Sequence, residues 1–128
     1  MLEIHYDWQR KLKKGKGMLA ILLVVAMSLT SCGSAYKNVT AAEAQQLIHE
    51  NSDLIVLDVR TQAEHDSGYI STALLIPMDE LADRLGELDE TKPILVYSQS
   101  GVRSAQASQM LVDNEFSRVH NLEGGIIA

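Results

Sequence analysis

The sequence predicts a single α/β domain in which helices cover both faces of a small parallel β-sheet. Three observations lead to this prediction. Short apolar runs rich in branched side chains recur along the chain, as is typical of strands covered on both faces. Each run is followed by a helical pattern, and such alternation of strands and helices favours a parallel sheet. The chain has 128 residues, of which 46% are hydrophobic and 22% charged, and this is the size and composition of one globular domain.

The first part of the chain has the pattern of an export signal rather than of a folded domain. Five of the 11 basic side chains lie in residues 1–17, and the apolar run 18–27 follows them. This run is shorter than the roughly 20 apolar residues that span a bilayer, so the two segments together predict a secretory signal. A buried helix of the fold is the alternative, although the run has no amphipathic face. Translation from Met18 would give a shorter form without the basic segment.

Cys32 is the only cysteine of the chain and lies in the sequence Leu-Thr-Ser-Cys-Gly-Ser at 29–34. This motif resembles the lipobox of bacterial lipoproteins, which implies that Cys32 is acylated and becomes the mature N-terminus. A single cysteine excludes an internal disulfide, and an unmodified thiol is the alternative. We therefore expect a signal peptide at 1–31, a tether at 32–38 and the folded domain at 39–128. The protein would be lipid-anchored in the cell membrane or outer membrane, facing the periplasm or the exterior.

The charge of the folded part excludes partners that are bound through many cations. The whole chain has a formal net charge of −6, and from Cys32 onward six basic side chains are set against 15 acidic ones. Nucleic-acid binding depends on Lys and Arg that neutralise phosphates, so no nucleic-acid partner is expected. The same surface disfavours anionic lipid headgroups, and membrane attachment would therefore depend on the acyl chains. We expect neither a metal ion nor a cofactor.

The N-terminal half of the domain is predicted from its caps and apolar runs. An edge strand over 36–39 is followed by a Thr-Ala-Ala-Glu capping box, which starts a helix over 41–49. The continuous apolar run 54–57 is expected to be a buried strand. The segment 61–68 begins with threonine as the N-cap and ends in glycine, which predicts a helix of one or two turns.

The C-terminal half repeats the same alternation. A strand over 74–76 stops at proline, which offers no donor to a sheet, and leucines recur on one face of a helix over 78–88. The central strand over 94–97 leads through a polar loop to a helix over 103–114, whose small and apolar residues suit close packing on a sheet. A last strand over 118–122 precedes a Gly-Gly turn, in which the backbone can approach the site closely.

The loop before the helix 103–114 is the candidate site. Ligands of α/β folds bind at the carboxyl ends of strands, and a following helix offers unpaired N–H groups and a partial positive charge. Arg103 adds a fixed positive charge with a planar set of donors that matches sulfur or phosphorus oxyanions. The expected anion-binding loop comprises Ser98, Gln99, Ser100, Gly101, Val102 and Arg103.

Several motifs of this domain resemble those of the single-domain rhodaneses, in the right order and spacing. They are Leu-Asp-Val-Arg at 57–60, Gly-Tyr-Ile at 68–70, Ser-Gln-Ser-Gly-Val-Arg at 98–103 and Asn-Leu-Glu-Gly-Gly at 121–125. The resemblance covers residues 36–128 and implies the rhodanese-like fold. It also implies that Asp58 and Arg60 organise the loops beside the active site. An ordinary surface ion pair between these two residues is the alternative.

Three departures from the family pattern bear on activity. Ser98 stands where the rhodaneses carry the cysteine that accepts sulfur, Tyr69 replaces a histidine, and the chain stops at Ala128, before the usual tryptophan and terminal segment. Sulfur transfer needs a thiolate formed from a thiol with a pKa of about 8.5 or lower, whereas a serine hydroxyl ionises far higher. Serine hydrolysis would need a base near Ser98, and His65 and His120 are the candidates in the folded part.

The resemblance and the departures together predict a rhodanese-like lipoprotein that binds its ligand without converting it. The ligand would be a small sulfate-like or thiosulfate-like oxyanion, or a carboxylate of a protein partner. Two alternatives stay open. One is a sulfurtransferase that handles thiosulfate or sulfane sulfur with a cysteine supplied by a partner. The other is a truncated copy that has lost its function.

Overall fold

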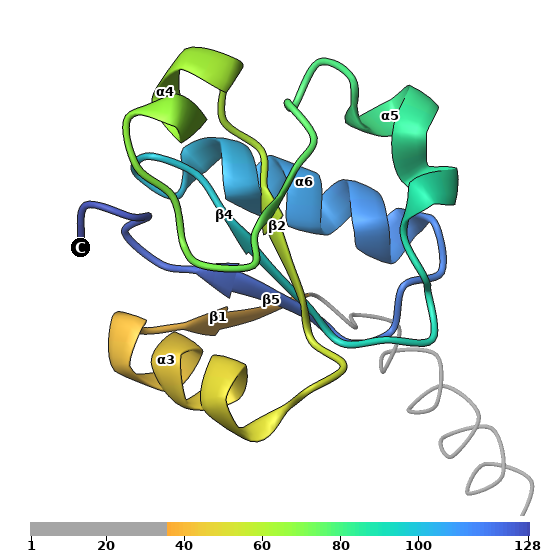
Figure 1. The fold of residues 1–128 in the computed structure, drawn as a ribbon. Coiled ribbons are helices and arrows are strands. Elements are labelled where there is room, and N and C mark those ends of the chain that lie inside the picture. The colour runs from red at the N-terminus through yellow and green to blue at the C-terminus, as the bar shows by residue number, and fades with distance from the viewer. Residues whose placement is uncertain (1–35) are drawn as a thin grey trace, which may run out of the picture. The chain divides into compact units, whose positions relative to one another are not determined.

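The sheet has five parallel strands in the order β1-β5-β4-β2-β3 (Figure 1). The computed structural model describes residues 36–128, so the predicted leader and Cys32 lie outside the described residues. The strands are β1 (Lys37–Val39), β2 (Ile55–Asp58), β3 (Leu74–Leu75), β4 (Ile94–Tyr97) and β5 (Val119–Leu122). The predicted α/β fold with a parallel sheet is confirmed.

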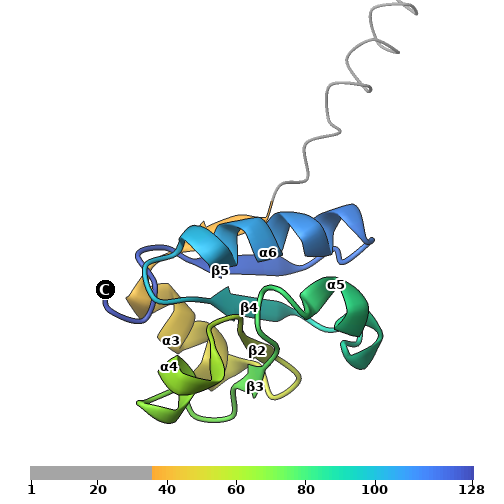
Figure 2. The same cartoon turned by 90° about the horizontal axis from the view of Figure 1, so that it is seen from above.

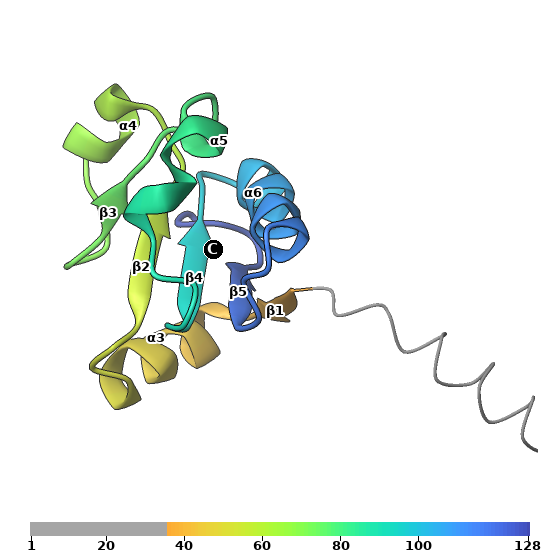
Figure 3. The ribbon, with the colours of Figure 1, turned by 90° about the vertical axis from the view of Figure 1, so that its right-hand side faces the viewer.

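Helices cover both faces of this sheet, as expected. Figure 2 shows α6 on one side of the sheet and α3 on the other, and Figure 3 shows α5 on the same side as α6. The short helix α4 lies beyond the carboxyl end of β2. The helices are α3 (Ala41–Glu50), α4 (Gln62–Asp66), α5 (Leu81–Arg84) with the 3-10 turn η1 (Leu85–Glu87), and α6 (Val102–Asp113).

The central strand β4 is completely buried because it contributes side chains to both layers of the core. Ile94 and Val96 pack with residues of α5 and α6, whereas Leu95 and Tyr97 pack in the layer that contains α3. Alternate residues of a strand point to opposite faces, so a strand covered on both faces needs apolar side chains throughout. The rigid end of β4 then fixes where the following loop begins.

Two helices begin with the same capping arrangement. At α3, the Thr40 N–H donates to the Glu43 carboxylate at 2.8 Å, and the Glu43 N–H donates to Thr40 Oγ1 at 3.3 Å. At α4, the Thr61 N–H donates to the Glu64 carboxylate at 2.9 Å, and the Glu64 N–H donates to Thr61 Oγ1 at 3.3 Å. Both predicted caps are therefore confirmed, and α4 has a complete capping box.

The helix predicted over 78–88 is wrong in its extent. The chain makes a turn first, because the Glu80 N–H donates to the Pro77 carbonyl at 2.9 Å, and only then forms α5. Gly86 follows within η1, and glycine weakens a helix by about 1 kcal/mol relative to alanine. The first and last leucines of the predicted apolar face are nevertheless buried in the core.

The strand predicted over 94–97 is observed with these bounds as β4. The remaining predicted elements differ from the observed ones by one or two residues at their ends, which is the usual uncertainty of element boundaries. The helix predicted over 103–114 begins one residue earlier, at Val102, so Val102 belongs to both the expected loop and α6. Within residues 36–128, no helix has the length and apolar character that crossing a membrane requires.

Candidate functional site

Ser98 follows β4, and its side chain is enclosed by the start of α6. Its Oγ accepts hydrogen bonds from the backbone N–H groups of Gly101 and Ser104, both at 3.2 Å, and donates to Ser104 Oγ, also at 3.2 Å. Only 1% of the residue is exposed. The Ser98 hydroxyl therefore occupies the point where one amide of the loop and one of α6 converge. Ser104 is a partner that the sequence analysis missed, since its inward position depends on the rotation of α6.

Apart from Gly101, the amides between Ser98 and Ser104 have no acceptor within residues 36–128. They are the N–H groups of Gln99, Ser100, Val102 and Arg103. The last two belong to the first turn of α6, where N–H groups have no intrahelical partner; the first helical hydrogen bond runs from the Ala105 N–H to the Gly101 carbonyl at 3.1 Å. Unpaired amides at a helix N-terminus attract anions. The predicted loop therefore has four backbone N–H groups without an acceptor among the described residues.

The Gly-Gly turn after β5 packs directly against the backbone of this loop. Gly101 has a φ of 96° and Gly125 a φ of 73°, a region that strains residues with a side chain. A Cβ on Gly125 would come within 2.2 Å of the Gln99 carbonyl oxygen. The Ile126 N–H also donates to the Ser98 carbonyl at 2.9 Å. The predicted close approach of this turn to the site is confirmed.

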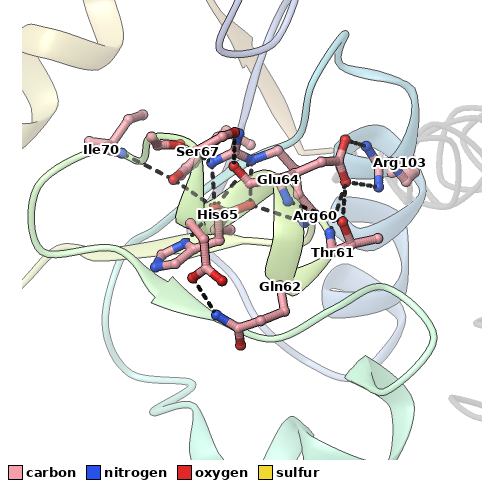
Figure 4. A network of polar contacts seen from close by, with 12 residues as sticks. Arg60, Thr61, Gln62, Glu64, His65, Ser67, Ile70 and Arg103 are labelled. Carbon is pink, nitrogen blue, oxygen red and sulfur yellow. Dashed lines mark hydrogen bonds and ion pairs between the residues drawn. The ribbon is translucent and has the colours of Figure 1, made fainter.

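The Arg103 guanidinium is paired with Glu64 of α4, a partner that the sequence analysis did not anticipate. Its Nη1 and Nη2 donate to the two carboxylate oxygens at 2.9 and 2.7 Å (Figure 4). Hydrogen bonds from Arg103 and from the Thr61 N–H lower the pKa of Glu64 to about 2, and the carboxylate raises the pKa of Arg103. Glutamate three residues after Thr61 was the available signal, but it indicates a cap rather than a partner for Arg103.

Asp58 and Arg60 form a buried pair at the end of β2. They are 0% and 2% exposed, so the surface ion-pair alternative is wrong. Arg60 Nη2 donates to the Asp58 carboxylate at 2.8 Å and to the Gly68 carbonyl at 2.7 Å. The carboxylate also accepts from the Tyr97 hydroxyl at 2.9 Å and lies 2.9 Å from His65 Nδ1.

This network connects β2, β4 and the segment around α4. Burial by itself raises the pKa of Asp58, but hydrogen bonds from Arg60, His65 and Tyr97 outweigh it and hold the pKa below its ordinary value. The Tyr97 hydroxyl in turn accepts from the Ile70 N–H at 3.1 Å. The Asp58 carboxylate therefore organises the chain on both sides of α4, and so holds in place the helix that carries the partner of Arg103.

Neither histidine considered as a base contacts Ser98. The Nδ1 of His65 is engaged by the buried carboxylate, and its ring stacks on Tyr69 with ring centroids 4.1 Å apart. His120 Nδ1 lies 3.3 Å from the carbonyl oxygen of Ile94, at the opposite end of β4. Within residues 36–128, the hydrogen bonds of Ser98 Oγ involve only the loop and α6. The serine-hydrolysis alternative therefore lacks its base.

Comparison with known families decides the affiliation of this domain. The family model described as the rhodanese-like domain matches residues 40–128, which is more than half of the chain. The chain belongs to the rhodanese-like family. This rhodanese-like chain is 39% identical over 83 residues to a sulfurtransferase of Allochromatium vinosum, covering 65% of this chain and 78% of that protein. It is 34% identical over 90 residues to the thiosulfate sulfurtransferase GlpE of Coxiella burnetii, covering 70% and 83%.

Solved structures support the same affiliation. A rhodanese-like domain protein from Staphylococcus aureus superposes with a TM-score of 0.67 at 35% identity, covering 72% of this chain and 89% of that one. A rhodanese-related protein from Thermoplasma volcanium gives a TM-score of 0.64 at 33% identity, covering 71% and 87%. The expectation of a single rhodanese-like domain with a small parallel sheet is thereby confirmed, and the sheet has five strands.

Proposed function

We propose that this rhodanese-like domain binds a small oxyanion, or a carboxylate of a protein partner, at the Ser98–Arg103 loop and has lost sulfur transfer of its own. The observation that carries the proposal is the position of Ser98 Oγ among the loop amides. By resemblance to the rhodaneses, this is the position of the sulfur-accepting cysteine, where amides and the helix dipole stabilise a thiolate. In this chain the same donors meet a hydroxyl, and the single cysteine of the sequence is Cys32.

A hydroxyl at this position cannot replace the thiolate. In sulfur transfer from thiosulfate, a thiolate attacks the outer sulfur, the S–S bond of thiosulfate breaks, sulfite leaves, and the enzyme holds a persulfide. Ser98 has no base in hydrogen-bond reach among the described residues, and its hydroxyl donates to Ser104. An O–S adduct would not be a comparable sulfur carrier. Recognition by the four unpaired amides is the capacity that the loop retains.

Anion binding should raise the melting temperature of the purified protein. A ligand that binds only the native state stabilises it by mass action, by about 2.7 kcal/mol at 100 times its Kd. We expect sulfate, thiosulfate or methanesulfonate to raise the melting temperature beyond the effect of chloride at equal ionic strength, as measured by thermal unfolding. Arg103→Ala should remove most of this difference, because it leaves Glu64 as an unpaired negative charge next to the loop. A melting temperature that follows ionic strength alone in all these salts would contradict the proposal.

The named sulfurtransferases among the relatives favour a second candidate, in which this domain handles sulfane sulfur with a cysteine supplied by a partner. Under this candidate, the loop would bind thiosulfate while the partner thiolate attacks it. Adding the partner would then speed transfer from thiosulfate, and the acceleration would depend on Arg103. The binding proposal instead expects bound thiosulfate to remain intact.

We also propose that Cys32 carries a lipid anchor and that residues 1–31 are removed as a signal peptide. The support is the basic and apolar leader that precedes the only cysteine of the chain. Cys32→Ala should shift the protein out of the membrane fraction or leave it unprocessed, as cell fractionation and electrophoretic mobility would show. A variant that is processed and membrane-bound as fully as the wild type would contradict the lipoprotein assignment.

A further inference from the structure

The Glu64–Arg103 pair lies next to the loop and has a fixed geometry. Glu64 accepts hydrogen bonds from the Thr61 N–H at 2.9 Å, from Thr61 Oγ1 at 3.0 Å, and from both Nη atoms of Arg103. The side chains of Arg103 and Glu64 are 34% and 30% exposed, so the pair lies at the surface, where a bound anion would meet it. Because α4 itself orients the carboxylate, Glu64 determines where the Arg103 charge is held.

The positive charges of the two arginines near the loop are each balanced by a carboxylate. The hydrogen bonds that Arg103 donates to Glu64 have the largest effect on the pKa of Arg103 and raise it, while Arg60 lowers this pKa and Asp58 raises it. The two charges of the buried Asp58–Arg60 pair therefore oppose each other in their effect on the pKa of Arg103. Each arginine near the loop thus has its own carboxylate, and the four amides remain as uncharged donors.

We propose that Glu64 sets the charge of the oxyanion that the loop accepts, so that singly charged oxyanions are preferred over doubly charged ones. This inference rests on the proposed function of the loop. The cost of removing an ion from water rises with the square of its charge. Neutral amides that have no unpaired cation beside them therefore compensate this cost more completely for a monoanion than for a dianion. The excess of acidic side chains in the folded part repels a dianion further.

Glu64→Gln tests this role without removing the helix cap. Glutamine can still accept the Thr61 N–H, since either residue completes a capping box, but it no longer neutralises Arg103. We expect the variant to bind sulfate about ten-fold more tightly than the wild type, because a dianion gains twice as much as a monoanion from the released charge. The affinity for methanesulfonate, which has the same sulfonate oxygens and a single charge, should rise less.

Glu43→Gln is a matched control for this experiment. Glu43 completes the same capping box on α3, with its carboxylate 2.8 Å from the Thr40 N–H and 3.1 Å from Thr40 Oγ1. The substitution makes the same change in net charge, and the Glu43 carboxylate has no hydrogen bond to Arg103 within residues 36–128. We expect its sulfate and methanesulfonate affinities to equal those of the wild type.

The double variant Glu64→Gln/Arg103→Ala completes the comparison. It removes both the Glu64 carboxylate and the Arg103 guanidinium, so the net charge beside the loop is again that of the wild type. We therefore expect the wild-type preference for methanesulfonate over sulfate to return. Arg103→Ala alone, in contrast, leaves the Glu64 charge uncompensated and should weaken the binding of both anions. Calorimetric titration of each variant with sodium methanesulfonate and sodium sulfate at equal ionic strength measures these affinities.

Two distinct failures can be told apart. If the wild type binds an anion but prefers sulfate, or if Glu64→Gln leaves the sulfate-to-methanesulfonate ratio at the value of Glu43→Gln, the role of Glu64 is refuted while the proposed function stands. If no variant binds either anion beyond the effect of chloride, the proposed anion-binding function falls, and the role of Glu64 falls with it.

Discussion

Replacing Asp58 by alanine should destabilise the domain by about 3–5 kcal/mol, because removing one partner of a buried ion pair leaves the other as an uncompensated charge. Arg60 is buried, and in the variant its guanidinium would keep the Gly68 carbonyl and its position over the Tyr97 ring, 5.3 Å from the ring centre. The Tyr97 hydroxyl and His65 Nδ1 would lose their shared acceptor as well.

Urea unfolding of the two proteins measures this loss. Asp66→Ala is the matched control, since Asp66 is an exposed carboxylate of α4 that is hydrogen-bonded only to Gln62 among the described residues. Such a surface substitution is expected to change the free energy of unfolding by about 0.5 kcal/mol or less. Equal losses in Asp58→Ala and Asp66→Ala would show that the buried network does not hold the fold together.

The Asp58 contribution should also depend on pH in a defined direction. The folded-state pKa of Asp58 lies below its ordinary value. The stabilisation is therefore fully present above the unfolded-state pKa of about 3.9, and it is lost as the pH falls through the lower folded-state value. The difference in unfolding free energy between the wild type and Asp58→Ala should be constant near neutral pH and shrink in acid. A difference that grows on acidification would contradict this assignment.

The fold was predictable because its signals are local. The apolar run of β4 is continuous since both faces of that strand are covered, and the Thr caps of α3 and α4 lie within one turn of the helices they start. The candidate loop could be found for the same reason, as a strand, a polar loop and a helix follow one another directly. The length of α5 was not predictable from its leucines, because the turn at Pro77 and Gly86 compete with the helical pattern.

The contacts that define the site were not predictable, because they join residues far apart in the chain. Glu64 and Arg103 are separated by 39 residues, as are Asp58 and Tyr97. No spacing rule relates such pairs, which meet only because β2 and β4 are neighbours in the sheet. The sequence placed Arg103 in the loop, but only the fold shows that its charge is already paired.

Ser98→Cys should introduce thiosulfate-to-cyanide sulfur transfer into a protein that we propose to have lost it. The substitution changes one atom. The amides of Gly101 and Ser104, which donate hydrogen bonds to Oγ in the wild type, would donate to the sulfur in the variant. Amide donors and the dipole of α6 lower a thiol pKa from about 8.5 and favour the attacking thiolate. Recovery should be partial, since by the resemblance to the rhodaneses Tyr69 replaces a histidine, and a misplacement of about 1 Å can cost about 10²-fold in rate.

The most direct test of this account is thiocyanate formation from thiosulfate and cyanide by purified wild-type protein, Ser98→Cys and Ser98→Ala. We predict no turnover by the wild type or Ser98→Ala and measurable turnover by Ser98→Cys. A Ser98→Cys variant that is folded yet inactive would show that the loop no longer supports a thiolate. Turnover by the wild type that Ser98→Ala abolishes would show that the serine itself takes part in sulfur transfer, and the proposal of a binding domain without its own sulfur transfer would have to be abandoned.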